Sequence, residues 1–149
     1  MFTDCYCTQF RRASNGLTRV YDAALRPAGI RITQFSLLRS LGRLGEASST
    51  QIAAELSLDR TTISRNLKLL TDAGWVDVID TPGKDRRERM LRLNASGQKV
   101  IANALPYFLN AQKTVENGAD EFLNAPTSER LMRALINLQN AGDKVEQVS

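Results

Sequence analysis

Apolar residues recur three and four positions apart in six stretches of this 149-residue chain. This spacing places apolar side chains on one face of an α-helix, so it predicts six amphipathic helices. They are expected at about residues 5–26, 33–44, 49–56, 60–73, 98–117 and 127–146. Two short segments, at about 75–79 and 90–93, predict strands joined by a loop at 81–87 that contains Pro and Gly. The pattern therefore predicts a mainly α protein with one small β-hairpin.

Residues that favour helix ends support these boundaries. The N-cap residues expected from the sequence are Thr33, Ser48, Asp59 and Thr127. Gln51 follows Ser48 at the spacing of a capping box, and Gly74 lets the chain leave helical geometry after the fourth helix. Pro106 lies inside the fifth helix and is expected to bend it.

The third and fourth helices are separated by residues 57–59, which is the spacing of a helix-turn-helix. With the hairpin as a wing, residues of about 32–93 are expected to form a winged helix-turn-helix core. The helices at about 5–26 and 98–146 carry more apolar surface than this core can cover. We expect them to be flanking dimerisation helices within a single domain, 1–149, although they could instead cover the back of the same chain. A two-fold dimer would place two recognition helices ~34 Å apart, which is one turn of DNA.

The predicted fourth helix has a polar and an apolar side. Thr61, Ser64, Arg65 and Lys68 lie within about 100° of one another around the helix axis. The apolar residues on the opposite side, which can anchor the helix to a core, are Ile63, Leu67 and Leu70. A helix that exposes hydroxyls and cations beside a cationic hairpin suits a DNA groove and its phosphates. A winged helix that served as a protein-interaction module would instead expose an apolar face.

Positive charge is concentrated in the same region. The formal net charge is +4, yet residues 60–71 carry three cations and no acid, and residues 84–92 carry five cations and two acids. The rest of the chain is therefore net negative. Such clustering is typical of nucleic-acid binding, although a charged run alone is more often a solvated surface. Arg92 alternates with apolar neighbours in its strand, and we expect it to pair with an acid such as Asp77.

Composition and motifs narrow the functional classes. The chain is 42% hydrophobic and 24% charged, which is ordinary for a globular protein. No apolar run approaches the roughly 18 residues that span a bilayer, and no signal-peptide pattern is present, so we expect a cytoplasmic protein without membrane contact. Histidine is absent, and no phosphate-binding loop, dinucleotide fingerprint or nucleophile motif occurs. We therefore do not expect an enzyme, a cofactor or a metal site.

The order of these motifs resembles the MarR family of bacterial winged helix-turn-helix transcriptional regulators, over nearly the whole chain. The most specific part is the Asp-x-Arg of the wing at 85–87, followed by Leu-x-Leu-x-x-x-Gly at 91–97. The other matching segments are 21–25 (YDAAL), 29–30 (GI), 33–38 (TQFSLL), 51–53 (QIA), 61–65 (TTISR), 69–70 (LL) and 74–76 (GWV). The resemblance implies a homodimeric DNA-binding regulator, most often a repressor and less often an activator. Its affinity for a pseudo-palindromic operator would fall when it senses a small molecule or an oxidant.

The resemblance also implies which residues meet double-stranded DNA. The recognition helix enters the major groove, and the wing reaches the neighbouring minor groove. Asp85 would orient a wing arginine by a charge-assisted hydrogen bond, and either Arg86 or Arg87 would enter the minor groove. The DNA-binding residues expected on this basis are Arg60, Thr61, Thr62, Ser64, Arg65, Lys68, Lys84, Asp85, Arg86 and Arg87.

A small aromatic or phenolic effector is a further expectation from the resemblance. Members of the family often bind aromatic acids between the dimer helices and the DNA-binding part, where an apolar slot and a cation suit a carboxylate. The candidate residues are Phe10, Tyr21, Phe35 and Phe108 for the wall, with Arg11 or Arg12 as the anion partner. The alternative is that the aromatic residues are core packing and the arginines form surface or interface ion pairs.

Cys5 and Cys7 suggest an alternative trigger, because some relatives sense oxidants through a cysteine near the start of the first long helix. Positions two apart on a helix point about 200° away from each other, so a bond between the two within that helix is not expected. A bond to a partner subunit or to a small thiol is possible if the pKa of one thiol is lowered. Otherwise the two residues are small apolar packing residues.

Overall fold

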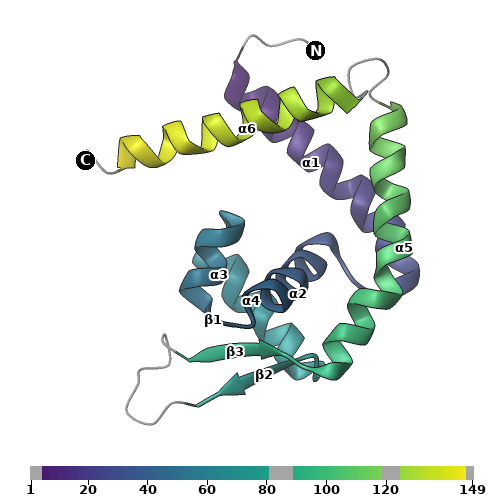
Figure 1. Cartoon of the computed structure of the whole chain (residues 1–149), viewed down its shortest axis with the longest axis vertical. Helices are drawn as coiled ribbons and strands as arrows, with labels where there is room; N and C mark the ends of the chain where they lie inside the picture. Colours follow the sequence, from purple (N-terminus) through teal and green to yellow (C-terminus); the bar gives the residue numbers. More distant parts are fainter. Residues whose placement is uncertain (1–4, 81–88, 119–124, 147–149) are drawn as a thin grey trace. The chain divides into compact units, whose positions relative to one another are not determined.

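The computed structural model describes residues 5–80, 89–118 and 125–146, with the side chains of 118, 125–128 and 141–146 left out. Its elements, shown in Figure 1, are α1 (Tyr6–Leu25), a short 3-10 helix η1 (Arg26–Ala28), α2 (Ile32–Leu44), β1 (Glu46–Ser48), α3 (Ser49–Leu56), α4 (Arg60–Asp72), β2 (Val76–Ile79), β3 (Met90–Leu93), α5 (Ala95–Gly118) and α6 (Ala125–Glu146). The predicted fold class, a mainly α winged helix-turn-helix protein, is confirmed. Residues 1–111 form one compact unit and residues 112–149 a second, and each is described by itself.

A buried apolar core around α2 holds the first unit together. α2 contacts α1, α3, α4 and the strands β1 and β3, and it buries Phe35, Leu38 and Leu41. Removing each such side chain from water stabilises the fold by roughly 1.5–3 kcal/mol. The other large side chains that are fully buried are Leu25, Leu37, Ile52, Ile63 and Leu70. α2 is therefore the scaffold on which both helices of the helix-turn-helix pack.

α3 and α4 begin at the N-caps that the sequence predicted. The hydroxyl of Ser48 accepts the backbone N–H of Gln51 at 3.2 Å, and the Gln51 side chain accepts the N–H of Ser48 at 2.8 Å. Asp59 accepts the backbone N–H of Thr62 at 2.8 Å. After α4, Gly74 has a φ of 76°, a left-handed conformation that glycine adopts at little cost. These local signals set the length and ends of the two helices.

The second helix begins earlier than the sequence predicted. Thr33 was expected to cap it, but α2 begins at Ile32 with Arg31 at the N-cap position. The reason is a contact across the chain, because Asp22 of α1 accepts the backbone N–H of Ile32 at 2.8 Å. The side chain of Gln34 also accepts the N–H of Arg31 at 3.1 Å. Thr33 therefore lies inside the first turn, and its predicted role was wrong.

Three short antiparallel strands form a sheet in the order β1–β3–β2. The sequence predicted β2 and β3 but not β1, whose three residues show no strand pattern. Pairing defines β1, since Ala47 lies opposite Leu91 and both are buried. On the exposed side of the sheet, Arg92 forms an ion pair with Glu46 at 3.6 Å. The expected pairing of Arg92 with an acid is confirmed, but the partner is on β1 and is not Asp77 of β2.

Asn94 joins the base of the wing to the start of α5. Its amide nitrogen donates to the carbonyl oxygen of Gly74 at 2.9 Å and to the carboxylate of Asp77 at 3.0 Å. Its side-chain oxygen accepts the N–H of Gly97 at 3.0 Å. Gly97 packs so closely that an added Cβ would overlap the carbonyl oxygen of Trp75. The end of α4, the strand β2 and the first turn of α5 are therefore held in one arrangement.

The outer helices expose apolar side chains. In α1 and α5 these are Tyr6, Phe10, Leu17, Leu105, Tyr107 and Leu109. In α6, within the second unit, Leu131, Met132, Ile136 and Leu138 are between 42% and 57% exposed. None of the described helices is long and apolar enough to cross a membrane.

In these outer helices the sequence predicted an N-cap at Thr127 and a bend at Pro106. α6 begins at Ala125, so Thr127 lies in its first turn and the prediction that Thr127 caps this helix was wrong. Pro126 is accommodated because proline is tolerated in the first turn of a helix. Pro106 lies within α5, as the sequence indicated, and the bend expected there stays a prediction.

The junction at Gly97 generates a stability prediction. Gly97→Ala should lower the free energy of unfolding by about 1–3 kcal/mol, because the new methyl group must displace the Trp75 backbone. Gly16→Ala is the matched control, since its Cβ has only the end of Arg19 within contact distance. The control should stabilise α1 by roughly 0.5–1 kcal/mol. Urea unfolding followed by circular dichroism measures both, and equal effects of the two substitutions would contradict the close packing at Gly97.

Candidate nucleic-acid interface

The side of α4 that faces outward is fixed by the side that is buried. Ile63, Leu67 and Leu70 belong to the core, with exposed fractions of 1%, 6% and 0%. The residues on the outward side line an open surface depression of about 460 Å³, and they are Arg60, Thr61, Ser64, Arg65 and Lys68. The structure thus brings together five of the six residues that the sequence singled out in this helix.

Thr62, the sixth of these residues, is engaged at the start of the helix. Its backbone N–H and its hydroxyl both donate to the carboxylate of Asp59, at 2.8 Å and 2.6 Å. Its carbonyl oxygen accepts the side-chain amide of Asn66 at 2.8 Å. The hydroxyl of Thr62 is therefore already committed as a donor within the protein.

The cations on this face differ in whether they form an ion pair with an acid of the same chain. Lys68 forms an ion pair with Asp72 one turn along the helix, with 2.6 Å between Nζ and the carboxylate oxygen. Arg60 and Arg65 form no ion pair with any acid in the part of the chain that the structure describes. Uncompensated guanidinium groups on an exposed face attract phosphate and can also hydrogen-bond base edges.

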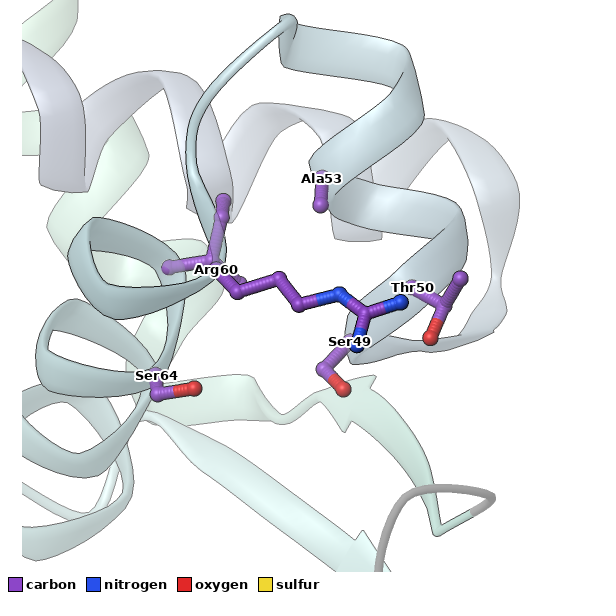
Figure 2. A pocket seen from close by; sticks show the side chains of 6 residues that line it. Ser49, Thr50, Ala53, Arg60 and Ser64 are labelled. Atoms are coloured by element: carbon purple, nitrogen blue, oxygen red, sulfur yellow. The ribbon is translucent and has the colours of Figure 1, made fainter.

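A second hollow, of about 340 Å³, lies between α3 and α4 (Figure 2). Its lining residues are Ser49, Thr50, Ala53, Arg60, Ile63 and Ser64. In Figure 2 the side chain of Arg60 extends from α4 toward Ser49 and Thr50 of α3. The sequence analysis missed these two hydroxyl residues, although a helix-turn-helix brings the starts of its two helices near each other.

The wing residues expected at the minor groove are Lys84, Asp85, Arg86 and Arg87, and all four lie outside the described residues. The described ends of the wing are charged. Arg89 forms an ion pair with Asp80, with 3.1 Å between Nε and Oδ1.

Three of the four aromatic residues proposed for an effector site lie together. The ring centroids of Tyr21 and Phe108 are 5.4 Å apart, and those of Phe35 and Phe108 are 4.9 Å apart. Phe35 is 1% exposed and belongs to the core, which is the alternative that the sequence left open. Phe10 of α1 has no aromatic ring contact among the described residues, and the residue is 42% exposed.

The cation beside these rings is Arg39, which sequence analysis did not single out. Its Cζ lies 5.3 Å from the ring centroid of Phe108 and 5.8 Å from that of Phe35. Arg11 instead donates to the sulfur of Cys7 at 3.7 Å. Arg12 is exposed on α1. Only the position of Arg39 in the folded chain, one turn after Phe35 on α2, reveals its contact with α5.

The two cysteines are exposed at the start of α1, and neither forms a disulfide among the described residues. The pKa of the Cys5 thiol is lowered, chiefly by hydrogen bonds from the side chain and backbone of Thr8, with a smaller electrostatic effect of Arg11. No group of three or more acidic, cysteine or histidine residues suited to a metal ion occurs among the described residues.

Known transcriptional regulators resemble this chain in sequence and in fold. A sequence model of a protein family, described as the MarR family, matches residues 28–88 of this chain. The M. tuberculosis transcriptional regulator MosR, in a crystal structure with DNA, has a TM-score of 0.78 and 31% identity, over 95% of this chain and 98% of that chain. Bordetella bronchiseptica BpsR, whose DNA binding is regulated by 6-hydroxynicotinic acid, has a TM-score of 0.79 over 93% of this chain and 96% of its own. It is only 18% identical, so this likeness shows the fold alone.

A sequence relative is the uncharacterized HTH-type transcriptional regulator YwoH of Bacillus subtilis strain 168. The two are 26% identical over 91 residues, which are 61% of this chain and 65% of YwoH. The chain therefore spans less than two thirds of that relative's length.

The N-cap of α4 generates a pH prediction. The pKa of Asp59 is lowered, first because the Thr62 hydroxyl donates to it and then because the Thr62 backbone N–H does so. A carboxyl whose pKa is lower in the folded protein stabilises the fold above its unfolded pKa, and this stabilisation is lost as the pH falls through the folded pKa. Asp59→Ala should therefore lower the melting temperature at pH 7, and its difference from wild type should shrink below about pH 4.

Asp59→Asn is the control for this measurement, because it keeps a side-chain acceptor at the N-cap while removing the charge. It should lose less stability at pH 7 than Asp59→Ala. A melting-temperature difference between Asp59→Ala and wild type that is constant from pH 7 to about pH 3 would contradict the role of the Asp59 charge.

Proposed function

Because the chain belongs to the MarR family of transcriptional regulators, we propose that it binds double-stranded DNA sequence-specifically and represses transcription. The observation that carries the proposal is the outward face of α4, where Arg60 and Arg65 stand beside hydroxyl residues without an acid paired to either guanidinium in the described chain. Such a face matches the phosphates and base edges of a major groove. The DNA in the MosR crystal structure supports the same partner class.

The proposed regulator acts as a homodimer. The apolar side chains exposed on α1, α5 and α6 support this state, because exposed apolar surface of this extent is typical of an interface. Two copies related by a two-fold axis would read a pseudo-palindrome, with each α4 in one half-site. The helices proposed for the interface are those outside the winged core, at about 5–26 and 98–146.

We propose a small aromatic acid as the effector that releases the DNA. Half-buried Tyr21 and Phe108 supply an aromatic wall, and Arg39 supplies a cation beside Phe108. A carboxylate on an aromatic ring could pair with that guanidinium while the ring stacks on its neighbours. This arrangement favours Arg39 as the anion partner over Arg11, which is engaged with a thiol.

The first test is selection from a random duplex library with the full chain, followed by binding of the enriched sequence across a salt series. We expect a pseudo-palindrome with half-sites about one helical turn apart. The logarithm of the affinity should fall linearly with the logarithm of salt concentration, with a slope of about −0.9 for each phosphate neutralised. Binding without any enriched sequence would overturn the proposal of a sequence-specific regulator.

A second candidate function is a redox response on the same fold, and the lowered pKa of Cys5 favours it. The thiolate is the form that hydrogen peroxide oxidises to a sulfenic acid, which condenses with a second thiol to a disulfide and releases water. A cysteine of the partner subunit or a small thiol could supply that second thiol, because Cys5 and Cys7 of one chain are not expected to bond to each other.

One comparison separates the two triggers. For an effector-controlled repressor, 4-hydroxybenzoate should weaken DNA binding by about tenfold in wild type and in the Cys5→Ser, Cys7→Ser double variant alike. Arg39→Gln should lose this response. Weakening by hydrogen peroxide that the double variant lacks, and that dithiothreitol reverses, would instead establish the redox function. Binding is measured by fluorescence anisotropy on the selected duplex.

A further inference from the structure

The hollow between α3 and α4 differs from the rest of the proposed DNA-binding face because its walls come from two helices. Its rim is polar, with Ser49 and Thr50 on α3 and Arg60 and Ser64 on α4 (Figure 2). Its floor includes Ile63, whose side chain is buried in the core. A concave site built from two helices can surround a ligand group on several sides, whereas the outer face of α4 meets a partner from one side only.

The charge at this hollow is positive. Glu55 and Asp59, the two acids between Ala53 and Arg60 in the sequence, both have other partners. Glu55 pairs with Arg43, and Asp59 accepts two hydrogen bonds from Thr62. Arg60 pairs with neither of them among the described residues, so its guanidinium is available to an anion.

We propose that this hollow holds one phosphate of the DNA backbone, and this inference rests on the proposed function. The guanidinium of Arg60 donates to two phosphate oxygens, for which its planar fork is well matched. The hydroxyls of Ser49 and Thr50, toward which this guanidinium extends, donate to the same phosphate. A phosphate carries no base identity, so these residues position the protein on the duplex and do not select its sequence.

The cations of α4 accordingly have two different roles in DNA binding. Arg60 lines both the hollow and the outer depression, whereas Arg65 and Lys68 line only the outer depression. Arg60 therefore anchors the helix to the backbone. Arg65, which has no acid paired to it in the described chain, is free to contact base edges.

The test uses the full chain and the sequence enriched from the library, together with duplexes that carry single base substitutions. Arg60→Gln should weaken binding to every duplex by about the same factor, roughly tenfold, and reduce the magnitude of the salt slope by about 1. Arg65→Gln should instead change the relative affinities at one base position. Arg31→Gln removes an equal charge from an exposed site outside the hollow and should have little effect.

A second measurement locates the phosphate itself. Duplexes that each contain one uncharged methylphosphonate linkage should reveal one position per half-site where wild type loses about tenfold in affinity and Arg60→Gln loses nothing further. Thr50→Val, which keeps the side-chain shape and removes the hydroxyl, should lose about threefold at unmodified linkages and less at that position. Circular dichroism confirms that each variant is folded.

These measurements distinguish failure of the phosphate site from failure of the proposed DNA-binding function. If wild type binds its selected duplex but Arg60→Gln alters base preference, or stays as sensitive as wild type at every methylphosphonate position, the phosphate site is wrong and the regulator stands. If wild type enriches no sequence at all, the proposed function fails and this inference fails with it.

Discussion

Burial of the apolar side of α4 in the core fixes the orientation of this helix. Ile63, Leu67 and Leu70 pack into the core that α2 organises, so the helix cannot rotate without exposing large apolar side chains. Exposing each of them would cost roughly 1.5–3 kcal/mol, which is a large part of the stability of a domain of this size. The polar residues of α4 consequently face outward as a set, and the chemistry of that face follows from the packing behind it.

Side-chain hydrogen bonds of Ser48, Asp59 and Asn94 extend this rigidity to the neighbouring elements. The caps at Ser48 and Asp59 fix where α3 and α4 begin, and with them the hollow between the two helices. Asn94 then connects the end of α4 and the base of the wing to α5. A binding face built on helices with fixed ends keeps its cations at constant spacing, which a regular partner such as a DNA backbone requires.

The parts that local sequence signals determine were predictable, and the parts that depend on contacts between distant residues were not. The capping box at Ser48 and the N-cap at Asp59 involve residues three positions apart, so the ends of α3 and α4 could be predicted. The start of α2 could not, because Asp22 of α1 supplies the acceptor for its first amide. Likewise β1 exists only through its pairing with β3. In the candidate sites, periodicity predicted the outward face of α4, whereas Ser49, Thr50 and Arg39 became candidates only through the packing of α3 on α4 and of α2 beside Phe108.

A crystal structure of the full chain with its selected duplex would show whether the outward face of α4 contacts DNA. We expect α4 to lie in the major groove, with Arg65 at base edges and Arg60 at a backbone phosphate beside Ser49 and Thr50. A complex in which α4 faces solvent, while the duplex lies against another surface of the protein, would contradict it.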